Sequence, residues 1–381
     1  MPHQNTVFHD LTKLVPWATF DRLVAQYKAD FRVRTLPTKV QFLALLYGQL
    51  AGTTGLREMV AALQSHAAKL YHLGGAPVPR STLSDANQQR PSALFGDLFA
   101  ALLKQARRGL RRELAETTYL IDSTSLPLNN FSEWAQFAVG VYGAKAHVIY
   151  DPDADQPIYF AVSAAKVNDI TAAKAMPILP GATYVFDLGY YDFGWWAKLE
   201  QQGCRFVTRL KKNTPLEVID ELPVAPGSNV LSDRIGFLPA RQASQRRNPM
   251  DHAVREVTVL TDTGKVLRVV SNDLDASAEA IAALYKRRWA IELLFRWLKQ
   301  VLRITKYFGR SENAIRIHIA VALIAFLLLR LAQQTQKQIQ APLAFARLVR
   351  INLMQRRRID RLLDLDEPHI TNPNQLVLQW S

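Results

Sequence analysis

Hydrophobic residues recur with helical spacing through about the first 113 residues of the chain. The segment VQFLALLYGQL after Pro37 has this spacing, and Gly52 to Gly55 interrupt it. A second helical segment begins near Leu56, and a longer one begins after Pro91. Because helical spacing and glycine-containing turns alternate here, we predict an all-α domain over residues 1–114.

After residue 115 the pattern changes to short apolar runs typical of strands. TTYLID ends at Asp122 and TYVFD ends at Asp187, and AHVIYD, PIYFAVS and CRFVTRL have the same character. Helical segments lie between them at about residues 168–175 and in WWAKLEQQG. This mixture of strands and helices predicts an α/β domain over residues 115–335.

Residues 212–271 have mainly strand-type patterning, interrupted by a polar, basic loop at about residues 238–250. VREVTVLTD and GKVLRVVS predict a hairpin with its turn at Asp262–Gly264. We therefore predict a β-rich insertion within the α/β domain, at about residues 212–271. Further on, the uninterrupted apolar run from Ile319 to Leu329 predicts a buried core helix, because a membrane-spanning helix needs roughly 18 such residues. Residues 336–381 are predicted to form a helical tail.

The segment YKRRWAIELLFRWLK predicts an amphipathic helix with an unusual polar face. At about 100° per residue, Tyr285, Arg288, Glu292 and Lys299 fall on one side. The opposite side is apolar and carries Leu284, Ile291, Leu294, Phe295, Leu298 and Leu302. Two interpretations fit this face. It is either a solvated surface with ion pairs from Glu292 to Arg288 and Arg296, or a functional face that joins a carboxylate to phosphate-binding cations.

The N-terminal domain contains a candidate DNA-reading helix. After the loop LGGAPVPR, the segment STLSDANQQR begins with Ser81 as a plausible N-cap. Short helices joined by glycine-containing turns are found in helix-turn-helix units, but also in purely structural bundles. In the first case the side chains available to contact DNA are Ser81, Thr82, Ser84, Asn87, Gln88 and Arg90.

The charge of the chain favours an anionic partner. The formal net charge is +14 and the sequence pI is about 9.9, which indicates nucleic acid first and acidic lipid second. A merely basic soluble protein is the alternative. The single cysteine, Cys204, excludes an internal disulfide and a cysteine-based zinc site. The N-terminal sequence MPHQNTVFHD lacks the apolar segment of a signal peptide, so we expect a cytoplasmic protein with no membrane partner.

Two aspartates share the same setting in the predicted α/β domain. Asp122 and Asp187 each follow an apolar strand and precede small or turn-forming residues. If the two strands are neighbours, their carboxylates meet at one edge of the sheet, and Glu292 on a packed helix completes a set of three. Three clustered carboxylates repel one another unless cations neutralise them, and two Mg²⁺ ions in such a site activate a nucleophile for attack on a phosphodiester. Aspartate is also a common turn residue, so each position alone carries little weight.

Other basic residues lie near the proposed sheet edge. Lys145 precedes the strand AHVIYD, and Arg209 and Lys211 end or follow the strand CRFVTRL. Contact with DNA phosphates and simple solvation are both open for these three side chains. His147, two residues after Lys145, has the pattern of a structural histidine with a local hydrogen bond.

The spacing Tyr-x2-Arg-x3-Glu-x6-Lys, formed by Tyr285, Arg288, Glu292 and Lys299, resembles the signature of the insertion-sequence-four family of bacterial DDE transposases. The blocks LIDSTSL and VFDLGYYDF resemble the family's two aspartate regions, and GAKAHVIYD is also similar. The similarity covers most of residues 20–330. It implies a ribonuclease-H-like catalytic domain with a β-rich insertion, preceded by a helical domain.

The resemblance also implies the site and its chemistry. Asp122, Asp187 and Glu292 would hold Mg²⁺, with Mn²⁺ as a substitute. The residues Tyr285, Arg288 and Lys299 would contact the transposon end. The protein would cleave the inverted-repeat ends and join the freed 3′-hydroxyls to target DNA as a homodimer, in the bacterial cytoplasm at the nucleoid.

Some relatives form a hairpin intermediate with the help of a tryptophan in the insertion. This chain has no tryptophan between Trp196 and Trp289, which puts that detail in question. An inactive DNA-binding repressor and a nuclease without joining activity are the alternative functions.

Overall fold

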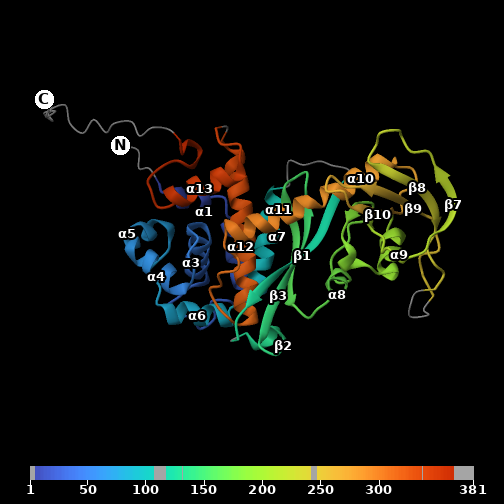
Figure 1. Cartoon of the computed structure of the whole chain (residues 1–381). Helices are drawn as coiled ribbons and strands as arrows, with labels where there is room; N and C mark the ends of the chain where they lie inside the picture. Colours follow the sequence, from blue (N-terminus) through green and yellow to red (C-terminus); the bar gives the residue numbers. More distant parts are fainter. Residues whose placement is uncertain (1–4, 107–116, 131, 242–246, 337, 364–381) are drawn as a thin grey trace, which may run out of the picture.

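The computed structural model describes residues 5–106, 117–130, 132–241, 247–336 and 338–363 (Figure 1). Helices form the N-terminal part: α1 (Val7–Thr12), α2 (Trp17–Gln26), α3 (Thr38–Ala51), α4 (Leu56–Ser65), α5 (Ala67–Leu70), α6 (Arg80–Gln89) and α7 (Ser92–Ala106). The remaining helices are α8 (Asp169–Ala173), α9 (Phe193–Gln201), α10 (Ala278–Arg287), α11 (Trp289–Gln300), α12 (Glu312–Gln334) and α13 (Pro342–Asn352).

The described strands form one ten-stranded sheet in the order β2-β3-β1-β5-β6-β10-β9-β8-β7, with β4 paired to β3. Their bounds are β1 (Thr118–Leu128), β2 (Gln136–Ala138), β3 (Val141–Asp151), β4 (Gln156–Ala164), β5 (Thr183–Val185), β6 (Arg205–Arg209), β7 (Glu217–Leu222), β8 (Val230–Phe237), β9 (Val254–Leu260) and β10 (Val266–Ser271). The chain is thus a mixed α/β protein with helices around a sheet, as its sequence predicts.

Parallel pairing lies at the centre of the sheet. Strand β5 runs parallel to both β1 and β6, whereas β3 and β10 pair antiparallel with β1 and β6 respectively. The predicted hairpin at Asp262–Gly264 is confirmed by the antiparallel pairing of β9 with β10. Through the β10–β6 pair, strands β7 to β10 continue the same sheet.

Two layers of helices cover this sheet. One face packs on α9 and α8 through buried aromatic residues, which include Tyr184, Trp195 and Trp196. The other face contributes Leu120 and Val185 to the larger core, together with residues of α7, α10, α11 and α12. Alternate residues of a strand point to opposite faces. Asp122, two residues beyond Leu120 in β1, therefore lies on the same face of the sheet as Leu120, against which α11 packs.

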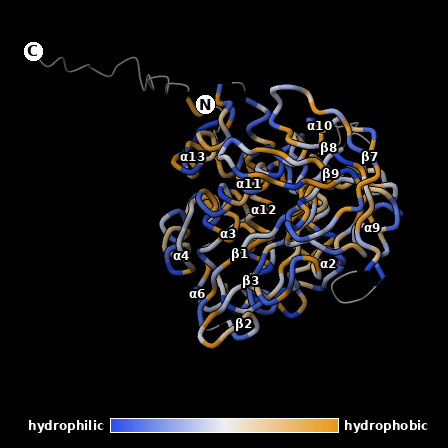
Figure 2. The backbone as a smooth tube through the Cα atoms, turned by 45° about the vertical axis from the view of Figure 1, so that its right-hand side comes forward, coloured by the Kyte–Doolittle hydropathy of each residue, from blue (hydrophilic) through white to orange (hydrophobic). Residues whose placement is uncertain are grey.

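Helix α12 is the centre of the molecule. It stands between the N-terminal helices and the strands in Figure 1, and Figure 2 shows hydrophobic residues concentrated where α3 and α12 lie. Its length and composition match those of a membrane span, but 83% of its most apolar window is buried inside the protein. This burial confirms that Ile319–Leu329 belongs to a core helix.

Two predicted DNA-contacting residues of the N-terminal domain are structural instead. Arg90 is 7% exposed and donates to the carbonyl of Leu36 and to Thr38 Oγ1 at 3.0 Å. Asn87 is 2% exposed and donates to the carbonyl of Phe308 at 3.0 Å. The prediction was wrong for this pair because the inward face of α6 packs against α3 and the segment before α12.

The predicted single helix around Glu292 is also corrected. α10 ends at Arg287 and α11 begins at Trp289, with Arg288 as the junction. At the junction the backbone hydrogen bonds are of the tighter three-residue type: the Arg288 amide donates to Tyr285, and the Ile291 amide donates to Arg288. The turn preserves the neighbourhood of Tyr285, Arg288 and Glu292, although Tyr285 lies on a different helix.

Candidate active site

Asp122 and Asp187 occupy equivalent positions on neighbouring parallel strands. Leu120 of β1 pairs with Val185 of β5, and each aspartate follows two residues later. The strand was predicted to end at Asp122, but β1 continues to Leu128 in its pairing with β3. Asp187 lies just beyond β5, where its Oδ1 accepts the amide of Gly189 at 2.8 Å. The shared register brings the two carboxylates to the place where β5 ends.

Arg288 connects Glu292 to this place. Its Nη1 lies 3.2 Å from Asp122 Oδ2, and its Nη2 lies 2.5 Å from Glu292 Oε1. Asp122 and Arg288 have side chains only 16% and 18% exposed, so solvent screens their attraction weakly. The ion pair expected in the purely structural interpretation of the helix is therefore present for Arg288. Arg296 instead lies over the ring of Trp289, 5.6 Å from its centroid.

Burial, and after it the neighbouring acids, disfavours ionisation of Asp122. Burial raises its pKa to about 7, and the carboxylates of Asp187 and Glu292 act in the same direction. The amide of Ser123 and the guanidinium of Arg288 oppose this shift. A carboxylate that resists ionisation beside two others creates a demand for added positive charge.

The tyrosine next to these acids responds to the same negative field. Tyr190 is fully buried, and its pKa is raised far above the ordinary value, first by burial and then by Asp122, Asp169 and Asp187. The field at this sheet edge is therefore strongly negative.

Asp169 is a site residue that the sequence reading missed. It begins α8, directly after Asn168, which occupies the N-cap of that helix without a side-chain cap bond. Asp169 Oδ1 instead accepts Ser123 Oγ at 2.7 Å and Lys145 Nζ at 3.1 Å. The adjacency of Ser123 to Asp122 is the one signal in the sequence, and it does not identify the partner.

Gly189 brings Asp169 close to Asp187. A Cβ added at Gly189 would lie 3.0 Å from Asp187 Oδ1 and 3.1 Å from Asp169 Oδ2, so a larger residue would displace the carboxylates. Asp169 is thus a fourth acid at the edge of the predicted set.

The basic residues predicted to touch DNA surround the acids unequally. Lys145 is held by Asp169, and Lys211 lies over the ring of Tyr191, 4.3 Å from its centroid. Arg209 is half-buried and acts electrostatically on Tyr285, whose pKa is raised mainly by burial. Lys299 is half-buried on α11, and burial lowers its pKa.

His147 has the local role that its sequence position suggests. Its Nε2 lies 2.8 Å from Ser163 Oγ, and its Nδ1 lies 3.7 Å from Asp169 Oδ1. Burial lowers its pKa to about 4, so the ring is neutral at physiological pH.

The donor chemistry of the acidic cluster, defined as Asp122, Asp187 and Glu292, fits a hard divalent cation. All its ligand atoms are carboxylate oxygens, the type that Mg²⁺ and Mn²⁺ prefer. Within the described residues the side chains are not arranged as a group of three metal ligands. The guanidinium of Arg288 bridges two of the three acids, Asp122 and Glu292. Its withdrawal would free the oxygens that a cation needs.

Comparison with known proteins places this chain among mobile-element enzymes. Residues 113–328 match the family described as Transposase DDE domain, and residues 3–76 match a family described as a domain of unknown function, DUF4372. A protein of Sinorhizobium fredii described as a transposase is 39% identical over 77% of this chain and 81% of its own length.

Two further relatives carry insertion-sequence names. The "Probable transposase for insertion sequence element IS5377" of Geobacillus stearothermophilus is 30% identical over 81% of this chain and 84% of its own length. A Synechocystis protein named for insertion sequence element IS4SA is 25% identical over 82% of this chain and 88% of its own length. The piggyBac transposase synaptic complex with hairpin DNA has a TM-score of 0.48 and 13% identity, covering 91% of this chain and 78% of that one. The family match covers more than half of the chain, and the protein therefore belongs to the family that carries the transposase DDE domain.

Proposed function

We propose that this protein is a DNA transposase of the insertion-sequence-four type with a ribonuclease-H-like catalytic domain. It would bind the inverted-repeat ends of its element, cleave them, and join the 3′-hydroxyl ends to target DNA. The observation that carries the proposal is the convergence of Asp122 from β1, Asp187 from the end of β5 and Glu292 from α11. Work on two ends at once would require a homodimer on DNA, in the bacterial cytoplasm.

Asp122, Asp187 and Glu292 would hold the metal in this proposal. Bound Mg²⁺, or Mn²⁺ in its place, would polarise the phosphodiester and make the attacking oxygen more nucleophilic. Asp122 must ionise before it can act as a ligand, and its raised pKa means that neutral to alkaline pH favours this state.

Arg288 would change partners when DNA arrives. In the free protein it neutralises Asp122 and Glu292. Once cations take over this neutralisation, its planar guanidinium is free to bind a phosphate oxygen pair. Tyr285 lies beside Arg288, and Arg209 lies near Tyr285; both would orient the DNA end. Lys299 and Lys211 would contact phosphates farther from the acids.

The direct test is a cleavage-and-joining assay with the purified protein. The substrate is a labelled duplex that carries the inverted repeat flanking the gene, and the target is a plasmid. We expect Mg²⁺-dependent cleavage and joined product, both reduced about 10³-fold or more by Asp122→Asn, Asp187→Asn or Glu292→Gln.

Asp262→Asn is the matched control. It makes the same chemical change at a surface turn, where Asp262 is 83% exposed and pairs only with Lys286 in the described part of the chain. Normal activity of Asp122→Asn would reject the assignment. Cleavage without joined product would identify a nuclease, and DNA binding without metal-dependent cleavage would identify a repressor.

A further inference from the structure

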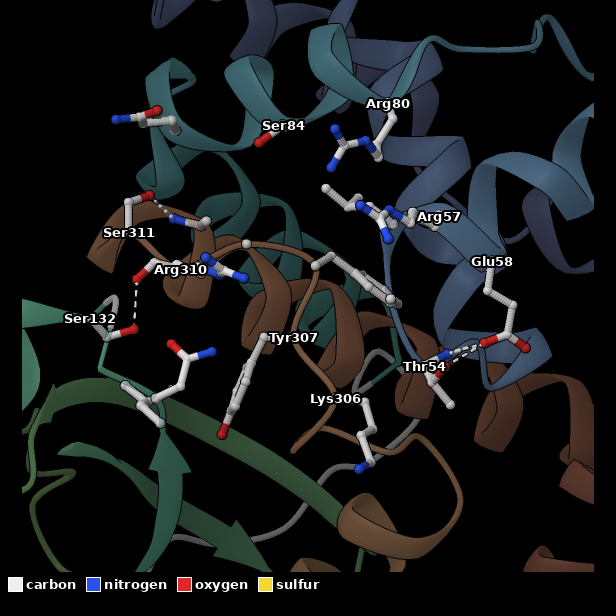
Figure 3. A pocket seen from close by; sticks show the side chains of 18 of the residues that line it. Thr54, Arg57, Glu58, Arg80, Ser84, Ser132, Lys306, Tyr307, Arg310 and Ser311 are labelled. Carbon is white, nitrogen blue, oxygen red and sulfur yellow. Dashed lines mark hydrogen bonds between the residues drawn. The ribbon is translucent and has the colours of Figure 1, made fainter. Parts of the chain in front are cut away.

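A basic groove lies between the N-terminal helices and the segment that leads into α12. Its volume is about 1000 Å³, and it is separate from the acidic cluster. Figure 3 shows Arg57 and Arg80 on one side, and Lys306, Tyr307 and Arg310 on the other. We call it the interdomain groove; α4, α6, the end of β1 and residues 305–311 form its walls.

The charge of the interdomain groove is strongly positive. Four cationic side chains line it, Arg57, Arg80, Lys306 and Arg310, against one carboxylate, Glu58. Glu58 already accepts the backbone amide of Thr54 at 2.7 Å and its hydroxyl at 2.6 Å, and these hydrogen bonds lower its pKa. Glu58 therefore stays ionised and is engaged with its own loop.

Three of the four groove cations are exposed to solvent and make no ion pair in the described part of the chain. Arg57, Arg80 and Lys306 are exposed, and none of them makes an ion pair within the ranges that the structure describes. A set of unpaired arginines and a lysine around a polar hollow is suited to phosphate oxygens, because these residues otherwise repel one another.

One wall of the groove is a regular row on α6. Arg80, Ser84 and Gln88 recur every four residues and line the same side of the helix. They present one cation and two uncharged hydrogen-bonding groups along about two turns. Such a row can follow a sugar–phosphate chain, with charge at one end and neutral donors along the rest.

The opposite wall is fixed by buried hydrogen bonds. Ser132 Oγ donates to the carbonyl of Arg310 at 3.0 Å, and Asn87 Nδ2 donates to the carbonyl of Phe308 at 3.0 Å. A Cβ added at Gly309 would lie 2.4 Å from the Cβ of Ala314, so this segment approaches α12 too closely for a side chain there. The groove is thus held open by the fold before any ligand binds.

From the charge, the row on α6 and the fixed wall, we infer that the interdomain groove binds the phosphate backbone of duplex DNA, away from the acidic cluster. This inference rests on the proposed function for the identity of the nucleic acid. Leu128 at the groove lies six residues beyond Asp122 on β1. At about 3.3 Å per residue, this places the groove roughly 20 Å from the acids. The contacted phosphates then lie roughly six nucleotides from the cleaved bond, at about 3.4 Å per nucleotide.

The first test measures DNA binding as a function of salt. A fluorescent mixed-sequence duplex of about 40 base pairs is titrated with the full-length protein and with the triple variant Arg57→Gln, Arg80→Gln, Lys306→Gln. Each lost phosphate contact makes the slope of log K against log salt shallower by about one, so we expect a change of about three. The melting temperature of each variant verifies that it is folded.

A matched variant controls for net charge. Arg22→Gln, Arg34→Gln and Lys198→Gln remove the same number of charges from exposed positions outside the groove. We expect this variant to change the slope by less than one. An equal effect of both triple variants, an unchanged slope in the groove variant, or no binding by the wild type would overturn the inference.

Asp122→Asn separates the two proposals. This variant should retain the wild-type slope of log K against log salt and should lose cleavage. Normal cleavage by Asp122→Asn would reject the proposed function but would leave the conclusion about DNA binding in the groove unchanged. Ethylation interference on the inverted-repeat duplex then locates the contact. We expect interference roughly six nucleotides from the cleaved bond in the wild type and its loss in the groove variant. Retention of this signal in the groove variant would contradict the inference.

Discussion

The guanidinium of Arg288 is bound to the carboxylate of Asp122, with Nη1 3.2 Å from Oδ2 across the interface between α11 and β1. The same side chain reaches Glu292 Oε1 at 2.5 Å. Arg288 therefore serves as an internal counter-ion for two acids of the proposed metal site. In the protein without metal, the positive charge of Arg288 balances the carboxylates that a metal ion would otherwise neutralise.

Arg288→Ala should destabilise the metal-free protein. The substitution leaves Asp122 and Glu292 close together without their cation, and we expect a loss of about 1–3 kcal/mol at pH 8. At pH 5 Asp122 is largely protonated, so the loss should be smaller. Chemical denaturation at the two pH values measures this difference, and added Mg²⁺ should reduce the loss at pH 8.

Arg296→Ala is the control for the Arg288 variant. Arg296 lies on the same helix but is exposed and stacks on Trp289, so its removal should change stability by less than about 0.5 kcal/mol. Equal losses for the two variants would show that Arg288 contributes no more than an ordinary surface arginine.

Asp122→Asn should stabilise the metal-free protein at alkaline pH. The folded pKa of about 7 lies above the ordinary value of 3.8, so the folded state holds a proton that the unfolded state releases. Wild-type stability should therefore fall as pH rises from about 4 through 7. Asparagine does not ionise, so the variant should melt a few degrees higher than wild type at pH 8, and this gap should be less than half as large at pH 5.

Thermal melting in a chelator, measured from pH 5 to pH 8, gives this comparison directly. Mg²⁺ should then raise the melting temperature of the wild type at pH 8 but not that of Asp122→Asn. A constant gap between the two proteins across the pH range would show that Asp122 does not titrate in this window.

Asp169→Asn should reduce the cleavage rate about tenfold while leaving the metal requirement intact. Asp169 fixes Ser123, the neighbour of Asp122, and holds Lys145 by charge. The amide of asparagine keeps the shape of the aspartate side chain but cannot form the ion pair with Lys145. Single-turnover cleavage measures the rate. Ser123→Ala, which removes only the hydroxyl, should reduce the cleavage rate less than Asp169→Asn does. Full activity of Asp169→Asn would show that Asp169 has a purely structural role.

The sequence contains enough to predict the acids and their strands. Asp122 and Asp187 follow apolar runs, and the pairing of β1 with β5 places them at matching positions of neighbouring strands, although β1 continues beyond Asp122. The turn at Arg288 was not predictable, because helical spacing alone does not show where the backbone tightens. The helix signature survives the turn because Arg288 still reaches Glu292 four residues later.

The site residue that the sequence did not predict, Asp169, contacts partners that are far away along the chain. Asp169 is 46 residues from Ser123 and 24 from Lys145. The β1–β3 pairing places Ser123 near Lys145, and the packing of α8 on β3 adds Asp169. Arg90 and Asn87 were misassigned for a related reason. Their exposure depends on which face of α6 packs inward, and a short polar helix gives no clear apolar stripe to decide it.

Binding of Mn²⁺ tests most directly whether Asp122, Asp187 and Glu292 together hold divalent cations. Electron paramagnetic resonance at pH 8 can count the bound ions on the full chain without DNA. The account predicts about two ions for each wild-type chain, with loss of this binding in Asp122→Asn and Asp187→Asn and no change in Asp262→Asn. The same number of ions at the same affinity in all four proteins would contradict it.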